Sequence, residues 1–321
     1  FVHRVELKNL EAEQIYKIEF FQSQFASGKE YFVKTMPKRL PKNLSFVVGG
    51  DMMHQQSLCE KMNSQAAKLQ ADFALLGGDL AYANGRSAKR WYIWFDTWAK
   101  SARRPDGLSL PVILVIGNHE VRGGYDQSMK EAPYFYSLFS FPNKEAFYSV
   151  DFADYLSIIV LDSQHSKKIS AQKSFLKKSL EERKEKPYLF VSYHFPAYGI
   201  LKKGLKNPIS KEIHRHWLPL FEQYQPDALF ENDHHIYKRS KLMYQGKENK
   251  QKGLLYIGDG AWGVSTRWIP AKENWPNYVA QALSRRHLIH VSLSSGIKKY
   301  TAYSAEGDVL DFFLDQRVLR D

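Results

Sequence analysis

The chain has 321 residues, of which 44% are hydrophobic and 14% are aromatic. This apolar content is enough for a sizeable core and excludes a chain that is disordered throughout. The longest apolar runs are far shorter than the roughly 20 residues that a membrane-spanning helix needs, so we expect no membrane span. Because Cys59 is the single cysteine, no disulfide can form within these residues, and any metal must be held by oxygen and nitrogen ligands.

The formal net charge is +12, from 46 basic and 34 acidic residues. A basic surface attracts anions such as phosphate esters, nucleic acid or anionic polysaccharide. The charge is spread along the chain without an arginine-rich tail, which is typical of solvated helix faces, so dedicated nucleic-acid binding is not expected. The chain begins with neither Met nor a charged-then-apolar leader, and we expect a mature product or a fragment.

The first 36 residues differ from the rest. Residues 3–10 and 16–22 alternate apolar and polar side chains, and residues 31–36 predict a third short strand. The spacing from Leu10 to Tyr16 resembles the tyrosine corner of a fibronectin type III-like sandwich. Three strands are too few for a whole sandwich. We therefore predict that residues 1–36 are the C-terminal part of such a β-domain, followed by a linker at 37–43.

From residue 44 to residue 321, short apolar strands alternate with helical segments, which predicts one layered α/β domain. Helices are expected at 57–70, 89–102, 170–185 and 212–224. Strands, several running on into a loop, are expected at 44–51, 71–79, 111–120, 155–163, 187–194, 226–235 and 253–260, and three more at 287–295, 298–306 and 309–315.

Polar side chains follow the central strands where each strand ends. In open α/β sheets, ligands bind at the edge formed by the carboxyl ends of the strands. Several strand ends that offer oxygen and nitrogen atoms to one edge suit a metal cluster. The residues concerned are Asp51, Asp79, Asn118, His119, His194, Asp233 and His235.

Five short blocks carry these residues in a fixed order. They are GGD ending at Asp51, GGDLAY with Asp79 and Tyr82, GNHE at 117–120, SYHFPAY at 192–198 and NDHHIYKR at 232–239. From about residue 45 to the end, the chain resembles the calcineurin-like metallophosphoesterases. It resembles the purple acid phosphatases most, because Tyr82 stands three residues after Asp79. The implied fold is a β-sandwich flanked by helices.

The resemblance implies a pair of metal ions. Asp79 would bridge them, and Asp51, Tyr82 and His235 would complete the shell of an Fe³⁺ ion, since carboxylate and phenolate oxygens suit a hard trivalent ion. Asn118 and His194 would serve a second ion, Zn²⁺, Fe²⁺ or Mn²⁺. Taken singly, each aspartate is also a common turn or helix-cap residue, and a tyrosine is more often a packed aromatic.

One position departs from the family pattern. Asp233 stands where the family usually has a metal-binding histidine. If residues 228–235 stay extended, Asp233 and His235 face one way and His234 faces the other, so Asp233 would approach the second metal. Its carboxylate would then lower the net charge of the cluster and raise the pKa of metal-bound water. The alternatives are that His234 turns in, or that the second metal site is half empty.

Other residues have smaller predicted roles. The resemblance implies that His119 contacts phosphate or protonates the leaving group. His165 follows a strand and is a second candidate catalytic residue that would line the cleft; the alternative is an exposed loop histidine. The loop lysines Lys202 and Lys203 either bind phosphate or are solvated, and His54 would support Asp51. His214 and His216 stand two apart on an expected helix, so we predict a poor ligand pair.

The resemblance implies hydrolysis of phosphate monoesters by a metal-bound hydroxide, with His119 assisting the leaving group. The alternatives are a phosphodiesterase acting on nucleotides or glycerophosphodiesters, and a phosphate- or sugar-binding relative with an impaired second metal site. The implied partner is a phosphate ester, with no membrane, and the implied location is secreted or periplasmic.

Overall fold

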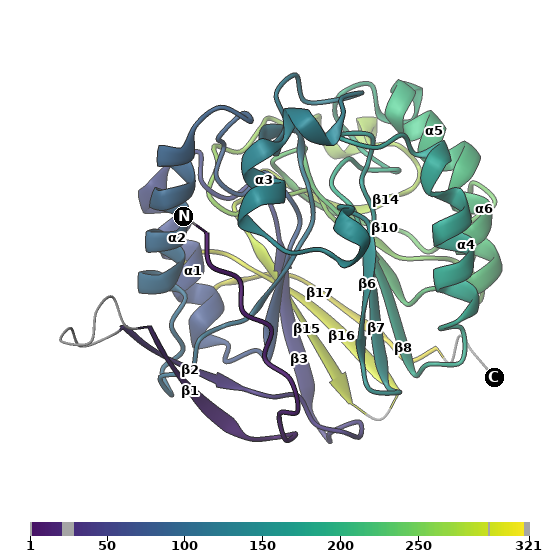
Figure 1. The fold of residues 1–321 in the computed structure, drawn as a ribbon. Coiled ribbons are helices and arrows are strands. Elements are labelled where there is room, and N and C mark those ends of the chain that lie inside the picture. The colour runs from purple at the N-terminus through teal and green to yellow at the C-terminus, as the bar shows by residue number, and fades with distance from the viewer. Residues whose placement is uncertain (1, 21–28, 295, 318–321) are drawn as a thin grey trace.

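Two large β-sheets lie face to face, and helices cover both outer faces (Figure 1). The computed structural model describes residues 2–20, 29–294 and 296–317. Its arrangement confirms the predicted layered α/β fold. One sheet has the order β17 (Val309–Asp315), β16 (Ile297–Tyr303), β15 (Leu288–Ser294), β3 (Leu44–Gly49), β4 (Phe73–Leu76), β5 (Val112–Leu114). The other has the order β14 (Val279–Leu283), β10 (Tyr237–Ser240), β13 (Tyr256–Gly258), β9 (Ala228–Glu231), β8 (Tyr188–Ser192), β7 (Leu156–Val160), β6 (Tyr148–Phe152).

Aromatic residues fill the space between the two sheets. The Phe46 ring on β3 stacks on Phe73 of β4 at a centroid distance of 4.9 Å. It also meets the edge of Phe190 on β8, in the opposite sheet, at 5.3 Å. All three side chains are buried, and each contributes roughly 1.5–3 kcal/mol of hydrophobic stabilisation. This central layer fixes the two sheets against each other and so aligns their strand ends.

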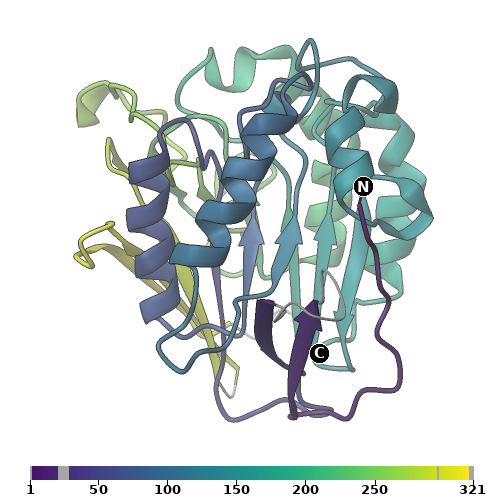
Figure 2. The same cartoon turned by 60° about the vertical axis from the view of Figure 1, so that its left-hand side comes forward.

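The helices form the two outer layers (Figures 1 and 2). Trp91 and Trp94 pack in the layer over β3, β4 and β5, whereas Trp217 and Phe221 pack in the layer over β8 and β9. The first layer contains α1 (Gln56–Lys68), α2 (Ala88–Ser101) and α3 (Pro133–Leu138), and the second contains α4 (Lys173–Glu181), α5 (Pro208–His216) and α6 (Leu218–Tyr224).

Local sequence signals explain where helices begin and end. Ser87 caps α2 by accepting a hydrogen bond from the Arg90 backbone N–H at 3.3 Å. Asn207 caps α5 in the same way, with Pro208 in the first helical position. The single helix predicted at 212–224 is wrong in one respect, because it is divided between α5 and α6 around Trp217. Pro219 lacks the N–H that a continuous helix would need there.

The N-terminal segment forms a small separate ribbon. Strands β1 (Ile15–Phe20) and β2 (Lys29–Lys34) pair antiparallel, with Ile15 opposite Lys34. The first strand, predicted at 3–10, is wrong, because that segment has no strand structure and pairs with no neighbouring strand. Residues 21–22 of the predicted 16–22 strand lie outside the described residues.

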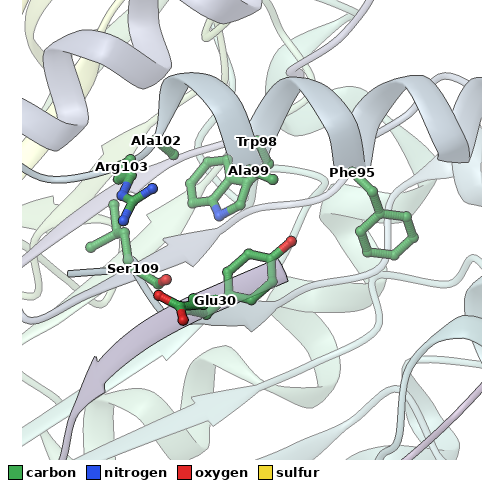
Figure 3. Close-up of a pocket in the computed structure, with 9 residues that line it drawn as sticks. Glu30, Phe95, Trp98, Ala99, Ala102, Arg103 and Ser109 are labelled. Carbon is green, nitrogen blue, oxygen red and sulfur yellow. The ribbon is translucent and has the colours of Figure 1, made fainter. Parts of the chain in front are cut away.

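A pocket of about 310 Å³ lies between this ribbon and α2 (Figure 3). Phe95 and Trp98 from the helix and Glu30 from β2 line it. None of the predicted ligand residues is in its wall, so it is separate from the strand-end cluster. Among the described residues, no helix is long and apolar enough to cross a membrane.

Candidate metal centre

The carboxyl ends of parallel strands bring the predicted ligands together. Strand β3 is parallel to β4, and β8 is parallel to β9, so each pair of strands ends at a common edge. Asp51 follows β3, Asp79 follows β4 and His194 follows β8. The ligand atoms of these three buried residues lie within 4.8 Å of one another. The sandwich therefore gathers side chains from both sheets at one point.

One half of the cluster surrounds Asp51. The His235 Nε2 atom lies 3.0 Å from Asp51 Oδ1. The Tyr82 hydroxyl oxygen lies 3.4 Å from the same Asp51 oxygen and 3.2 Å from His235 Nε2. Asp51, Tyr82 and His235, predicted as one shell, are thus brought together.

The other half surrounds His194. Its Nε2 atom lies 3.4 Å from Asp79 Oδ2 and 3.3 Å from Asn118 Oδ1. The same nitrogen lies 3.7 Å from Asp233 Oδ1. Its Nδ1 atom lies 2.7 Å from the Gly77 carbonyl oxygen and therefore donates to it, which leaves Nε2 unprotonated when the ring is neutral. This is the orientation that a metal-binding histidine requires.

The donor atoms fit metal ions. Ligands about 2.1 Å from one cation stand roughly 3.0–3.4 Å apart. The donor atoms around Asp51, and those of His194 with Asp79 and Asn118, have this spacing, whereas Asp233 Oδ1 lies slightly farther away at 3.7 Å. Asp51, Asp79 and Asp233 are nearly fully buried, and buried carboxylates require positive charge nearby. Burial opposes the ionisation of both Asp79 and His194, but their attraction lowers the pKa of Asp79 and raises that of His194. A bound cation would supply this positive charge in place of a proton on His194.

The backbone is strained at the cluster. Five of the seven predicted ligands have left-handed φ angles, namely Asp51 at 57°, Asp79 at 52°, Tyr82 at 52°, Asp233 at 76° and His235 at 55°. Each such residue costs roughly 1 kcal/mol relative to the right-handed region. Strain of this kind collects at functional sites, where the surrounding structure holds it in place.

Two residues that sequence reasoning missed hold the loops. The buried Glu120 carboxylate accepts hydrogen bonds from the backbone N–H groups of Asp79, Leu80 and Gly117, at 2.7, 2.9 and 2.8 Å. Asn232 packs so tightly on Gly77 that a Cβ there would lie 2.0 Å from its side chain. The glutamate in GNHE and the asparagine in NDHH stand beside ligands in sequence, which is the only local signal of these roles.

His119 lies between the cluster and an open cavity of about 500 Å³. Its backbone N–H donates to Asp79 Oδ1 at 2.7 Å, and its Nε2 lies 3.8 Å from Asp79 Oδ2. Its Nδ1 pairs with the Asn84 side-chain oxygen, a contact that the sequence did not reveal. His54 and Arg90 also line the cavity. This wall offers both a proton donor and positive charge to a bound anion.

His165 is buried rather than exposed. Its Nε2 lies 3.0 Å from Ser163 Oγ and its Nδ1 lies 3.1 Å from the Gly124 carbonyl. Burial lowers its pKa to about 3, so the ring is neutral. The centroid of its ring lies 5.4 Å from that of the His194 ring. A direct role in the cleft stays a prediction, and the contacts favour support of His194.

His54, His214, His216 and Lys203 contribute no donor atom to the cluster. The centroid of the His54 ring lies 5.4 Å from that of the Tyr82 ring, and both residues line the cavity. On α5, His214 lies 3.0 Å from the Ala197 carbonyl and His216 lies 3.3 Å from Glu212. The two histidines therefore have different partners, as their spacing predicts. The Lys203 side chain is exposed.

The predicted extended course of residues 228–235 is wrong. Strand β9 ends at Glu231, and Asp233 and His235 adopt left-handed φ angles in a tight turn. The Asp233 N–H donates to Asp51 Oδ2 at 2.9 Å, which fixes this turn to the cluster. Asp233 and His235 both face the donors, whereas the Nδ1 of His234 lies 3.6 Å from Asp259 Oδ2. A turn, not strand phase, places these side chains.

A two-sheet sandwich with carboxylate, imidazole, amide and phenol groups at its strand ends is the arrangement that the resemblance to the metallophosphoesterases predicts. A sequence profile of the calcineurin-like phosphoesterase family matches residues 44–237, and the chain belongs to this family. The chain is similar to purple acid phosphatase 13 of Arabidopsis thaliana, with 24% identity over 309 residues, which cover 82% of this chain and 54% of that protein. The probable purple acid phosphatase 20 of the same plant is 25% identical over 256 residues, covering 76% of this chain and 57% of that protein.

Solved structures share the fold. The purple acid phosphatase PPD1 from yellow lupin (Lupinus luteus) aligns with a TM-score of 0.75 and 19% identity, over 97% of this chain and 61% of that one. GAP50, the anchor in the inner membrane complex of Plasmodium, aligns with a TM-score of 0.64 and 15% identity, over 88% of this chain and 92% of that one. The predicted family is confirmed. The chain spans little more than half the length of the curated relatives it matches.

Proposed function

We propose that this chain hydrolyses phosphate esters, chiefly monoesters, with two metal ions. The proposal rests on the convergence of Asp51, Asp79 and His194 to within 4.8 Å at buried strand ends. Asp51, Tyr82 and His235 would complete the site of an Fe³⁺ ion, with Asp79 shared between the two ions. Asn118 and His194 would hold Zn²⁺, Fe²⁺ or Mn²⁺, as the resemblance to purple acid phosphatases implies. Asp233, whose Oδ1 lies 3.7 Å from His194 Nε2, would take the place of the usual histidine beside them.

Bound as a pair, such ions acidify water and neutralise charge on the phosphoryl oxygens. The protein's own part is to place acid and anion-binding groups beside them. With Nδ1 engaged by Asn84, His119 presents Nε2 on the side of Asp79 and the cavity, and it would donate a proton to the leaving oxygen. Arg90 and His54 in the same wall would bind the rest of the anion.

One observation favours the alternative of a phosphate- or sugar-binding relative with an impaired second site. The Asp233 carboxylate is already paired with the Lys202 ammonium at 2.6 Å. A binder would hold phosphate without turnover. The phosphodiesterase alternative has no contact that favours it over the monoesterase.

The test uses purified protein of measured metal content and a matched pair of chromogenic esters, p-nitrophenyl phosphate and bis(p-nitrophenyl) phosphate. We expect two ions per chain and faster turnover of the monoester. His119→Ala should lower kcat by about 10²-fold or more, because general acid catalysis contributes that much. Faster diester turnover would make the chain a phosphodiesterase. Phosphate binding without turnover of either ester would make it a binder.

We also propose that residues 1–36 are the C-terminal part of a fibronectin type III-like domain. The Glu11 N–H donates to the Tyr16 hydroxyl oxygen at 2.8 Å, the type of contact that defines a tyrosine corner. The ribbon β1–β2 and the linker at 37–43 are consistent with this division. A structure of a longer chain in which β1 and β2 do not join a sandwich would disprove it.

A secreted or periplasmic location is proposed on the family resemblance, and cell fractionation tests it.

A further inference from the structure

Lys202 holds the residue that departs from the family pattern. Its Nζ atom lies 2.7 Å from Asp233 Oδ1 and 2.6 Å from Oδ2, so the ammonium contacts both carboxylate oxygens. The Asp233 side chain is 2% exposed, whereas that of Lys202 is 34% exposed. The partly exposed Lys202 side chain therefore brings its ammonium group to a buried carboxylate.

Lys202 lies in a loop whose backbone is strained. Lys202, Lys203 and Gly204 have successive left-handed φ angles of 48°, 71° and 50°. Two of the three are not glycine and pay a steric cost for this conformation. The Asn207 side chain, which also caps α5, donates to the Lys202 carbonyl oxygen at 3.1 Å. The loop is thus fixed to a helix end and directs Lys202, but not Lys203, toward Asp233.

Asp233 also belongs to the half of the cluster around His194. Its Oδ1 lies 3.7 Å from His194 Nε2 and accepts a hydrogen bond from the Tyr125 hydroxyl at 3.2 Å. The same hydroxyl donates to Asn118 Oδ1 at 3.1 Å. The oxygen that faces the second metal site is therefore one of the two oxygens held by Lys202.

The Lys202–Asp233 contact affects the net charge of the second metal site. A histidine at position 233 would be neutral, whereas Asp233 adds one negative charge and Lys202 adds one positive charge. The pair is neutral overall, so it keeps the charge of the site close to that of a histidine. The ammonium nevertheless occupies lone pairs of the carboxylate and repels a cation beside it.

We propose that Lys202 is a resident counter-ion that competes with the second metal ion for Asp233. The inference rests on the metal pair of the proposed function and predicts that the two sites bind their ions with unequal affinity. The site around Asp51 and His235 binds its ion tightly. The site around His194 and Asp233 binds its ion weakly, because the ion must share or displace the ammonium.

The experiment titrates metal-stripped protein with Zn²⁺, using calorimetry and elemental analysis of the bound metal. We expect one tight and one weak equivalent in the unaltered chain. Lys202→Met keeps the apolar stem and removes the charge, and it should tighten the weak equivalent by about tenfold or more while leaving the tight one unchanged. Lys203→Met, which makes the same charge change one residue away, should change neither.

A second variant guards against damage to the loop. Lys202→Arg keeps the charge and a two-pronged contact with the carboxylate, so its second equivalent should stay weak. Thermal unfolding of each variant checks that it is folded. Two equally tight sites in the unaltered chain would overturn the inference. So would a second equivalent that is no tighter in folded Lys202→Met, or one that tightens equally in Lys202→Arg.

Turnover of p-nitrophenyl phosphate, measured on the same zinc-saturated samples, separates this inference from the proposed function. If the two sites bind Zn²⁺ with unequal affinity, Lys202→Met tightens the weaker one and no ester is hydrolysed, the inference stands and the proposed phosphatase activity is refuted. If the ester is hydrolysed but the two sites bind Zn²⁺ equally tightly, the proposed activity stands and the inference is refuted.

Discussion

Tyr82 links two ligands of the Asp51 half of the cluster. Its hydroxyl oxygen lies between Asp51 Oδ1 and His235 Nε2, at 3.4 and 3.2 Å. Burial, followed by the negative charge of Asp51, raises the pKa of this phenol far above its usual value. Ionisation to a phenolate thus requires a strong local positive charge, such as a trivalent cation.

The first prediction follows from that requirement. Protein loaded with Fe³⁺ should show a visible charge-transfer band, and Tyr82→Phe should abolish it because the phenolate is gone. The absorption spectrum is the measurement. Tyr125→Phe is the control, since Tyr125 bonds Asn118 and Asp233 and lies in the other half of the cluster. A band that survives in Tyr82→Phe would exclude this tyrosine as the iron ligand.

The second prediction concerns Asp79, which lies 3.4 Å from His194 and is the proposed bridge between the two ions. Asp79→Ala should lose both metals, whereas Asp51→Ala should mainly lose one. Elemental analysis after dialysis measures the outcome. Asp96→Ala, on the exposed face of α2, controls for the change in charge. Retention of two metals and of activity in Asp79→Ala would contradict the two-metal arrangement.

At the level of secondary structure, the loops that follow the strands position the metal ligands. The loops after β4 and β5 are joined through Glu120, whose carboxylate accepts from the backbone of Asp79, Leu80 and Gly117. Both oxygens of this buried carboxylate act as acceptors. Glu120 is therefore a positioning residue, because it acts on the metal site through backbone rather than through contact with substrate.

The third prediction is that Glu120→Gln loosens this connection. A glutamine keeps the shape but presents an NH₂ donor to a backbone donor, and leaving buried groups unpaired costs about 1–3 kcal/mol. We expect a lower free energy of unfolding and weaker binding of the ion shared by Asp79, measured by urea titration and metal titration. Glu182→Gln, on the exposed end of α4, should alter neither quantity. Metal affinity that stays unchanged in Glu120→Gln would limit Glu120 to a purely structural role.

At the scale of the whole molecule, His290 on β15 is a half-buried histidine away from the metal centre. Burial, with a smaller contribution from Lys299, lowers its pKa to about 4. Its Nε2 atom has no hydrogen-bond partner within the described residues. The folded chain thus keeps this ring neutral, whereas the unfolded chain protonates it below a pH of about 6.5.

The fourth prediction is the resulting pH dependence. Because the unfolded state binds the extra proton, stability falls as the pH falls from about 6.5 to about 4, and this ring contributes about 3 kcal/mol to the loss. His290→Leu should flatten the decline in the free energy of unfolding across that window. His3→Leu, at an exposed position, is the control. Equal declines in the two variants would show that His290 does not drive the effect.

Much of the fold could be predicted because its signals are local. Apolar runs such as 44–49 and 156–160 form β3 and β7, and the helices α1 and α2 follow the expected segments. The predictions missed β6, β10 and β14, in which exposed or polar positions interrupt the apolar pattern. The strand predicted at 3–10 failed for the opposite reason, because alternation alone does not provide a partner strand.

The amino-acid sequence was sufficient to identify the family and the residue types of the candidate metal centre. Both are encoded in short blocks, where a strand, a turn and a ligand are neighbours along the chain. Which groups those ligands contact depends instead on the three-dimensional fold. Lys202 and Asp233 are 31 residues apart, and Glu120 and Asp79 are 41 apart. A period or a motif reports only neighbours in sequence, whereas such pairs form only after loops from different strands have been folded to one edge of the sandwich.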